Sequence, residues 1–336
     1  MTKPNIIAIG ASAGGVETLS NLVSQLPSDL NAAIFVAIHF PPRATSVLPQ
    51  ILNRLKTIPA QHPAEGNAIT PGQIYIAPPD HHLFVRQGHI HLDHGARENG
   101  HRPAINTLFR SIAYAYGRQA TGVILTGTLD DGTAGLLTIK ARGGIAIVQD
   151  PNEALFAGMP LSAINAVEVD EILRVRDIAK RLIELSLTPI HEQKPMTDEI
   201  SHEGEWVAQE KAAIEQGERT GLASTFTCPD CGGVLWELHD QNLMRYRCHV
   251  GHAYSIDSLL SEKDNSLERA LWTAYRALEE KAALARRMAA QAQRSNYSIS
   301  EANFLERAAE AEQHVAVLKQ VLLQQIELPI QPEEMD

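Results

Sequence analysis

The sequence predicts an α/β domain in its first 188 residues, where buried-type strands alternate with stretches of helical spacing. Three apolar runs, each ending in a polar or glycine-rich turn, are the first reason; they are Asn5–Ile9, Ala32–Ile38 and Gly122–Leu125. The second reason is Gly10-Ala11-Ser12-Ala13-Gly14-Gly15, which follows the first run and leads into helical spacing from Val16 to Leu26. Together these observations predict a strand, a tight turn and a helix at the start of the domain.

Ser12 stands at the tip of that glycine-rich turn. Glycines let the backbone turn sharply and approach a ligand closely, and the following helix start offers free N–H groups. The pattern G-x-S-x-G is typical of a nucleophile elbow, which presents a hydroxyl beside oxyanion donors. A phosphate-binding turn or a helix cap uses the same residues, so this motif alone leaves catalysis and binding open.

A histidine and an acidic pair follow the other two apolar runs. His39 comes directly after the second run, and Asp130-Asp131-Gly132 closes the turn after the third. In open α/β sheets the carboxyl ends of the strands form the edge where sites lie. An imidazole can accept a serine proton, and a carboxylate can hold the imidazole tautomer. The sequence therefore predicts that Ser12, His39 and an acid meet at one edge of the sheet.

Four ordered motifs and one further stretch carry a family resemblance. They are the Ser12 turn, Ala37–Pro41, Arg102–Phe109, Leu125–Gly132 and Gly158–Ile164. Over residues 1 to about 185 the chain resembles the catalytic domain of the CheB family of chemotaxis protein-glutamate methylesterases. The resemblance implies a doubly wound, mostly parallel sheet. It also implies Ser12 as nucleophile, His39 as general base and acid, and Asp131 as the orienting acid, with Asp130 in reserve.

Three further residues complete the site that the resemblance implies. The backbone N–H groups of Ala13 and Thr128 are expected to hold the oxyanion. Arg102 either holds an acidic group of the substrate or forms a structural salt bridge. The family's Gly-Met-Gly before the acid reads Gly127-Thr128-Leu129 here, a departure that could alter the turn. Family members commonly carry a preceding receiver domain, but the first strand starts at Asn5, so we expect none and no control by phosphorylation in cis.

The implied activity is hydrolysis of glutamate γ-methyl esters on chemoreceptors through an acyl-serine intermediate. It could extend to deamidation of glutamine, which would make the enzyme a protein-glutamine glutaminase as well. No cofactor is expected for this catalysis. The alternative is a non-enzymatic scaffold, in which the glycine-rich turn binds a nucleotide or phosphate and the C-terminal segments recruit partners. The coincidence of serine, histidine and acid favours the esterase.

Charge and hydropathy limit the expected partners and location. The net charge of −11 over 336 residues argues against general binding to nucleic-acid phosphates. No apolar run approaches the roughly 18 residues of a membrane span, and no secretory leader follows Met1. We therefore expect a cytoplasmic protein that neither binds nucleic acid nor inserts into a membrane.

The three cysteines cluster near the C-terminal third of the chain, which points to a metal rather than to disulfides. Cys228 and Cys231 have the C-x₂-C spacing of one zinc knuckle, and Cys248 with His252 would form a second. His249 is less favoured as a ligand, because it directly follows Cys248. We predict a structural Zn²⁺ on Cys228, Cys231, Cys248 and His252; three reduced, half-buried thiols are the alternative.

The whole chain divides into five predicted regions. They are a catalytic domain at 1–188, a linker at 189–223 with a short helix over Trp206–Glu218, a zinc-ribbon-like module with a hairpin at 224–256, a helical hairpin or coiled coil at 257–328 and a tail at 329–336. We expect the ribbon and helices to target or gate the enzyme, since they are the other folded mass in the chain.

The helical region has a heptad-like apolar seam on each of two helices, typical of an antiparallel hairpin or of self-association. The seam comprises Leu260, Leu267, Leu271, Ala274, Leu278, Ala282 and Ala285, then Phe304, Ala308, Ala311, Val315, Leu318 and Leu322.

A histidine-rich stretch lies between the two halves of the α/β domain. Short strands are expected there as a β excursion, over Gln73–Ala77, Leu83–Arg86 and His89–Leu92. His89 and His91 share one face of a strand, and His81, His82 and His94 lie close by in sequence. A solvated strand face is favoured over a metal site, because no convergent pair of carboxylates accompanies them.

Overall fold

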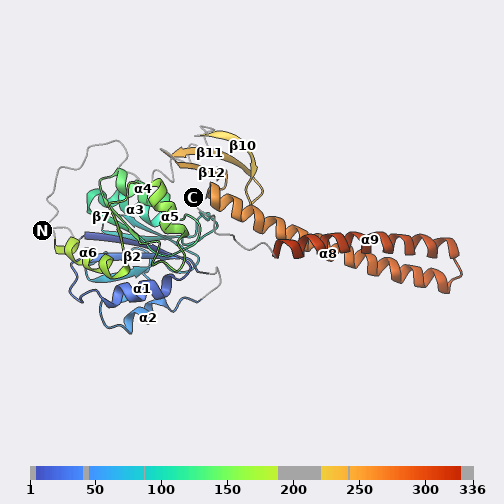
Figure 1. Cartoon of the computed structure of the whole chain (residues 1–336), viewed down its shortest axis with the longest axis horizontal. Coiled ribbons are helices and arrows are strands. Elements are labelled where there is room, and N and C mark those ends of the chain that lie inside the picture. Colours follow the sequence, from blue (N-terminus) through green and yellow to red (C-terminus); the bar gives the residue numbers. More distant parts are fainter. Residues whose placement is uncertain (1–4, 41–44, 87, 188–220, 241–242, 327–336) are drawn as a thin grey trace. The chain divides into compact units, whose positions relative to one another are not determined.

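The computed structural model describes residues 5–40, 45–86, 88–187, 221–240 and 243–326 (Figure 1). Its contacts divide the chain into two units, Met1–Leu259 and Leu260–Asp336, which are described in turn. The predicted linker at 189–223, apart from its last three residues, and its predicted helix over Trp206–Glu218 lie outside the described residues. No helix in the described ranges is both long enough and apolar enough to cross a bilayer.

The α/β domain is built on a sheet of seven parallel strands in the order β3-β4-β2-β1-β7-β8-β9. The strands are β1 Asn5–Ala11, β2 Ala32–Ile38, β3 Ala60–Gln61, β4 Gln73–Ile76, β7 Ala120–Ile124, β8 Ile145–Gln149 and β9 Glu171–Leu173. The chain leaves central β1 for β2 on one side and returns to β7 on the other. This reversal of strand order beside β1 confirms the predicted doubly wound α/β class and is where such folds place their sites.

Helices cover both faces of this sheet (Figure 1). One layer comprises α1 Gly15–Ser24, α2 Leu48–Asn53 and α6 Val175–Leu187; the other comprises α3 Ile105–Tyr116, α4 Thr133–Ala141 and α5 Gly158–Ala166, with a 3₁₀ turn at Gly117–Gln119. Alternate residues of β1 serve the two layers, since Ile7 packs with the first and Ile6 with the second. Burial on both faces explains why β1 and β2 are near-continuous apolar runs.

The predicted β excursion is only partly correct. β5 His82–Arg86 and β6 His89–Asp93 form a two-stranded antiparallel hairpin, as expected. The first predicted strand, Gln73–Ala77, instead belongs to the main sheet, where β4 pairs in parallel with β2. Its residues Ile74 to Ile76 are buried, and a strand buried in this way needs the cover that the central sheet provides.

The cysteine-containing segment forms a separate antiparallel sheet within the first unit. Its strands are β10 Leu222–Thr227, β11 Val234–Asp240, β12 Leu243–Cys248 and β13 Ala253–Ser255. β11 and β12 make the hairpin that the sequence predicts. A small core forms around Leu235, Tyr246, Tyr254 and Leu259, and it includes two of the cysteines. We call residues 222–255 the ribbon.

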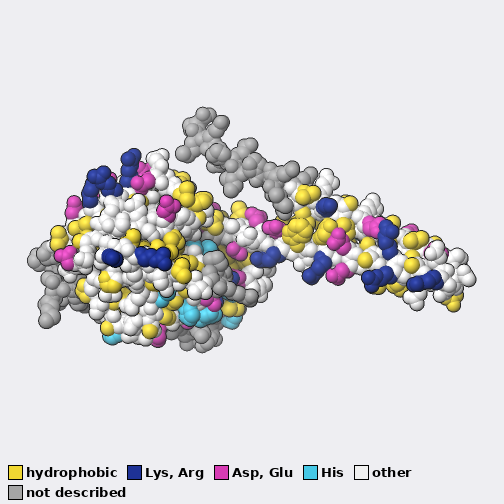
Figure 2. Space-filling model, turned by 90° about the horizontal axis from the view of Figure 1, so that it is seen from below, with side chains coloured by type: hydrophobic (Ala, Val, Ile, Leu, Met, Phe, Trp, Pro, Cys, Tyr) yellow, Lys and Arg dark blue, Asp and Glu magenta, His cyan; other side chains and the backbone are white. Residues whose placement is uncertain are grey.

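Two long helices, α8 Ile256–Arg294 and α9 Ser298–Ile326, carry the predicted seam. They run antiparallel beyond Leu260, and Arg286 pairs with Glu312 at 2.5 and 2.8 Å. Apolar and charged side chains are interspersed on their surface (Figure 2). The buried residues of the predicted seam are Ala282, Ala285, Ala308, Ala311 and Leu322, and Ala289 and Ala292, outside the predicted seam, are buried as well. Leu260 and Leu267 are 63% and 50% exposed, and Ala274 is exposed too, so these seam positions are not buried between the two helices.

Candidate functional site

Ser12, His39 and Asp131 meet at the carboxyl edge of the sheet. Ser12 follows β1, His39 follows the adjacent β2, and Asp131 lies in the loop between β7 and α4. His39 Nδ1 lies 3.0 Å from Ser12 Oγ, and His39 Nε2 lies 2.8 Å from Asp131 Oδ2. The side chains of His39 and Asp131 are only 7% and 2% exposed, whereas Ser12 is half-buried and reachable. This is the geometry of a nucleophile, a base and an orienting acid.

Asp131 is held from several sides. The backbone N–H of Ile105, at the start of α3, donates to Oδ2 at 2.7 Å, and that of Asn106 donates to Oδ1 at 3.3 Å. The side-chain amide of Asn99 donates to Oδ1 at 3.2 Å. Burial by itself would raise the pKa of Asp131, but the hydrogen bond from His39 lowers it below its usual range. The carboxylate is therefore kept charged to orient His39.

A second imidazole lies flat against the first. The rings of His39 and His101 are stacked, with centroids 3.6 Å apart and planes inclined by 13°. Burial, together with the charge of His39, lowers the pKa of His101 to about 4. A neutral His101 can restrict the ring of His39 without placing a second positive charge beside it.

Gly127 is required by the close approach of three chain segments at Ser12. A Cβ on Gly127 would lie 2.9 Å from Ser12 Cβ and 2.1 Å from Met159 Sδ. The Gly127 carbonyl accepts from the N–H of Met159 at 2.9 Å, and its N–H donates to the carbonyl of Phe156 at 3.0 Å. The loop after β7 is thereby fixed against α5 at a spacing that no side chain at 127 allows.

Of the predicted oxyanion donors, Ala13 directly follows Ser12 and Thr128 lies in the loop between β7 and α4. The N–H groups of Ala13 and Thr128 donate to no acceptor among the described residues, so these donors stay candidates. The N–H of Ser12 itself is used, since it donates to the Thr126 carbonyl at 3.0 Å. Gly14 is left-handed, with φ of 73°, and ends the turn at the start of α1.

Arg102 follows the structural alternative left open by the sequence. Its guanidinium donates to Asp80 Oδ1 at 2.9 and 2.7 Å and to the carbonyls of His94 and Gly95. The hydrogen bond from Arg102 lowers the pKa of Asp80 below its ordinary value. With its donors engaged in this way, Arg102 fixes the loop before α3.

Asp130 points to a different set of partners from Asp131. Its Oδ1 accepts from the hydroxyls of Ser255 and Ser258, each at 2.8 Å. Burial raises the pKa of Asp130, against the lowering effect of those two hydroxyls. The two adjacent acids therefore have separate environments, with Asp131 hydrogen-bonded to His39 and Asp130 to the junction of β13 and α8.

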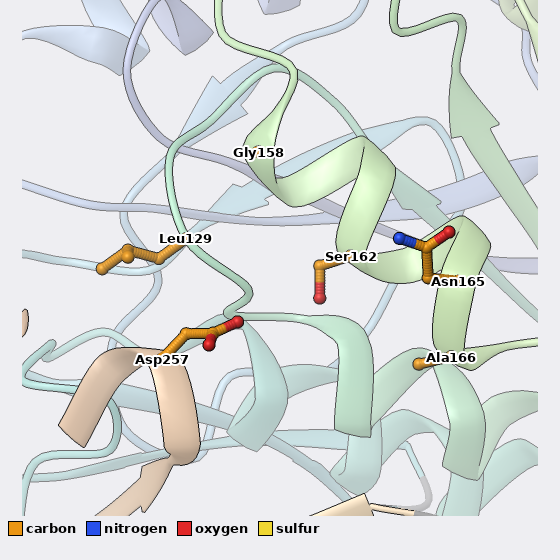
Figure 3. Close-up of a pocket in the computed structure, with 6 residues that line it drawn as sticks. All are labelled: Leu129, Gly158, Ser162, Asn165, Ala166 and Asp257. Carbon is orange, nitrogen blue, oxygen red and sulfur yellow. The ribbon is translucent and has the colours of Figure 1, made fainter. Parts of the chain in front are cut away.

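A pocket of about 430 Å³ lies beside this acidic turn (Figure 3). Leu129 of the turn and Asp257 of the first turn of α8 form one side, and α5 forms the other through Gly158, Ser162, Asn165 and Ala166. Ser162 is already engaged with the Thr133 hydroxyl at 3.0 Å. The pocket shows that the start of α8 helps to line the surface next to the loop that carries Asp130 and Asp131.

Cys228, Cys231, Cys248 and His252 converge as the sequence predicts. Their ligand atoms all lie within 4.8 Å of one another. His252 Nδ1 lies 3.6 Å from Cys228 Sγ and 3.5 Å from Cys248 Sγ, and Cys231 Sγ lies 3.6 Å from Cys248 Sγ. His249 is absent from this group, in agreement with the preference for His252.

The chemistry of this group suits a thiophilic cation. Burial and the neighbouring Cys228 raise the pKa of Cys248 to about 12, so thiolates packed this closely are unfavourable by themselves. A divalent cation reverses that balance, because it binds deprotonated thiols. Four protein ligands are typical of a closed, structural zinc site.

The histidine-rich stretch makes local pairs. His91 pairs with Glu65 at 2.7 Å and His94 with Asp80 at 2.7 Å. Buried His82 uses both ring nitrogens, on the carbonyl of Ala96 and the N–H of Ala104. In the part of the chain that the structure describes, these histidines do not form a metal-binding group.

Sequence reasoning missed Asn99, His101 and Met159 as neighbours of the triad. Asn99-Gly100 is a typical turn dipeptide and could have marked the loop. Nothing in the sequence indicates that this loop folds onto Asp131, more than 30 residues away. Met159 does lie in one of the stretches that carry the family resemblance.

Known proteins match the α/β domain. The model of the CheB methylesterase family matches residues 7–182. A protein-glutamate methylesterase/protein-glutamine glutaminase of Photorhabdus laumondii is 37% identical over 187 residues, covering 54% of this chain and 53% of that protein. One of Syntrophus aciditrophicus is 36% identical over 188 residues, covering 55% and 54%. The chain thus spans about half the length of the curated relatives it matches.

A solved structure agrees with the fold. The crystal structure of the Thermotoga maritima CheB methylesterase catalytic domain aligns with a TM-score of 0.52 and 34% sequence identity. The alignment covers 55% of this chain and 99% of that one. The likeness therefore concerns the α/β domain rather than the ribbon and helices.

Proposed function

Since this chain belongs to the CheB methylesterase family, we propose that its α/β domain hydrolyses glutamate γ-methyl esters with Ser12, His39 and Asp131. The observation that supports this best is the continuous chain of hydrogen bonds from Ser12 Oγ through His39 to Asp131. The hydroxyl of a helix cap or phosphate-binding turn has no need of such a base. Family members named for both activities support deamidation of glutamine as a second reaction of the same site.

The proposed reaction uses the triad twice. Ser12 Oγ attacks the ester carbonyl while His39 Nδ1 takes its proton, and the oxyanion is held by the N–H groups of Ala13 and Thr128. The tetrahedral intermediate collapses, and His39 returns the proton to the leaving methoxy group, which departs as methanol. Water then attacks the acyl-serine with His39 as base, and the products are the glutamate carboxylate and free Ser12. Glutamine would release ammonia in place of methanol.

The substrate we propose is a methylated chemoreceptor. Around Ser12 the rim exposes large apolar side chains on different segments, including Val16 of α1, Leu129 of the acidic turn, and Leu155 and Phe156 of the loop before α5. Leu155 adjoins the Ser12 turn, since a Cβ on Gly14 would lie 3.0 Å from it. An apolar rim around a reachable hydroxyl suits a protein surface such as a receptor helix.

We further propose that Cys228, Cys231, Cys248 and His252 bind one structural Zn²⁺ that stabilises the ribbon. The convergence of all four ligand atoms supports this assignment. The ion would take no part in ester hydrolysis, because a site with four protein ligands has no open position for substrate.

A fluorophosphonate probe tests the esterase directly, because it labels an activated serine. We expect wild type to be labelled and to release methanol from a methylated receptor fragment. Ser12→Ala should do neither, and Ser162→Ala, at a hydroxyl that is hydrogen-bonded to Thr133, should behave as wild type. Absence of labelling in folded wild type would overturn the esterase and favour the phosphate-binding alternative.

A further inference from the structure

We infer that Asn99 is a positioning residue for the triad acid and that the ribbon holds Asn99 in place. The inference rests on the proposed esterase function and extends it to a segment outside the catalytic domain. Asn99 is 3% exposed and lies in the loop before α3. Its side-chain amide lies between Asp131 on one side and β13 of the ribbon on the other.

Both ends of the Asn99 amide are engaged. Asn99 Oδ1 accepts from the backbone N–H of Ser255 at 2.9 Å, and Nδ2 donates to Asp131 Oδ1 at 3.2 Å. Because the backbone group at Ser255 is a donor, it fixes the oxygen on the ribbon side and leaves the NH₂ group for the carboxylate. The amide therefore transmits the position of β13 to the acid that orients His39.

The backbone of the same loop is also joined to the ribbon. The N–H of Asn99 donates to the Ala253 carbonyl at 2.7 Å, and the N–H of Ala253 donates to the Arg97 carbonyl at 3.2 Å. Asn99 has φ of 52°, a left-handed conformation that asparagine and glycine adopt most readily. The backbone of this loop is thus hydrogen-bonded to β13 as a neighbouring strand of a sheet would be.

A buried ion pair network supports the loop next to Asn99. Glu98 pairs with Arg110 of α3 and with Arg245 of β12, the latter at 3.5 Å. Burial would raise the pKa of Glu98, but the two arginines lower it well below its usual range, so the carboxylate stays charged. One end of this network belongs to the catalytic domain and the other to the ribbon. Loss of Arg245 would therefore loosen the loop from the ribbon side alone.

The acidic turn itself receives contacts from Ser255 at the end of the ribbon and from Ser258 in the first turn of α8. Asp130, adjacent to the triad acid, accepts from the hydroxyls of Ser255 and Ser258. The ribbon end thus contacts both Asp130 and, through Asn99, Asp131. These contacts explain how a module without catalytic groups can set the activity of the triad.

Asn99→Gly is the main test, because glycine keeps the left-handed backbone and removes only the amide. On a small methyl ester we expect kcat to fall about 10- to 100-fold with KM unchanged, the scale of losing one hydrogen bond to a charged group. The matched control is Asn296→Gly, at an exposed asparagine with φ of 57° in the turn between α8 and α9; it should leave kcat unchanged.

Asn99→Asp separates positioning from folding. It keeps the acceptor for the Ser255 N–H but presents a second carboxylate oxygen to Asp131. The two neighbouring carboxyl groups should then keep a proton up to a higher pH, so the acidic limb of the plot of kcat against pH should shift to higher pH. A purely structural contact would not move that limb. This variant also serves as the test if Asn99→Gly fails to fold.

A double-mutant cycle tests the ribbon's part. Arg245→Met should lower kcat about 3- to 10-fold, and the loss should vanish in the Asn99→Gly background, because both changes act through one residue. Arg276→Met, at an exposed arginine of α8, is the control and should have no effect.

The outcomes separate this inference from the proposed function. If Asn99→Gly and Asn99→Asp kept the kcat and the pH profile of wild type, the positioning role of Asn99 would be overturned. The proposed esterase function would still stand if the fluorophosphonate probe labelled wild type. An unchanged kcat in Arg245→Met, or losses that multiply in the double variant, would overturn the link to the ribbon. Failure of wild type itself to hydrolyse ester would overturn the proposed function.

Discussion

The triad and the cysteine group are both clusters of reactive side chains, but they are organised by different forces. Ser12, His39 and Asp131 are far apart in sequence and are aligned by a buried parallel sheet, at hydrogen-bond distances of 3.0 and 2.8 Å. The cysteine group comes from one short segment. Cys231 Sγ lies 3.6 Å from Cys248 Sγ, and burial raises the pKa of the Cys248 thiol. The fold organises the first cluster, whereas we expect a cation to complete the second.

This difference predicts that the two clusters fail in different ways. A substitution in the triad should abolish chemistry and leave folding intact, because the sheet exists without it. Loss of the metal should loosen the ribbon first and reach the chemistry only through Asn99. The predictions below test that contrast, beginning with the largest effect.

Ser12→Ala and His39→Ala should each lower ester hydrolysis by orders of magnitude, since members of a triad act as a unit. Steady-state rates on a small methyl ester measure the loss, and thermal unfolding checks that each variant is folded. The double variant should be no worse than either single one. A variant that keeps more than about a tenth of the wild-type rate would remove that residue from the triad, since even one oxyanion donor contributes about 10²-fold.

Asp131→Asn should lower kcat by up to about 10⁴-fold, because an amide can hold His39 in the wrong tautomer. Asp130→Asn is the matched control one residue away. It keeps an oxygen for the hydroxyls of Ser255 and Ser258 and should lose far less. Rates of the two variants on the same ester decide between them, and the reverse order would make Asp130 the orienting acid.

Zinc should bind one to one and stabilise the ribbon, because small metal modules fold on their metal. Metal analysis of protein purified without chelator measures the stoichiometry. Cys231→Ser should bind zinc weakly and unfold at a lower temperature. Its kcat should fall about 10-fold, because a loosened ribbon no longer fixes Asn99. His249→Ala, next to a ligand but outside the group, is the control. Reduced protein without zinc would contradict the metal assignment.

The smallest effect is expected from the helices. A chain ended after Asn265 keeps the ribbon contacts and should hydrolyse a small ester at the wild-type rate. Its activity on a methylated receptor should change, falling if the helices target the receptor and rising if they restrict access. The small ester is the internal control for both outcomes. If the shortened chain matched the full chain on both substrates, the helices would have no influence on catalysis.

Most of the fold and the proposed triad could be predicted from the sequence, because both depend on patterns that neighbouring residues form along the chain. Runs such as Ala32–Ile38 are apolar throughout, since they are covered on both faces, and each ends at the sheet edge. The cysteine spacing is local and likewise readable. The sequence places Gln73–Ala77 in the wrong sheet, because so short a strand carries no signal for its partner. Leu260 and Leu267 fit the heptad spacing, but spacing does not tell where two helices begin to pack.

By itself the sequence determined the α/β class and predicted the proposed triad residues and metal ligands, because strand burial, turn chemistry and ligand spacing are properties of neighbouring residues. Only the tertiary structure decided the uses of the remaining polar groups. It paired Arg102 with Asp80, separated Asp130 from Asp131 and placed the amide of Asn99 between the triad acid and the ribbon. The reason is physical: each buried polar group must find a partner, and that partner is set by which segments the folded chain brings together.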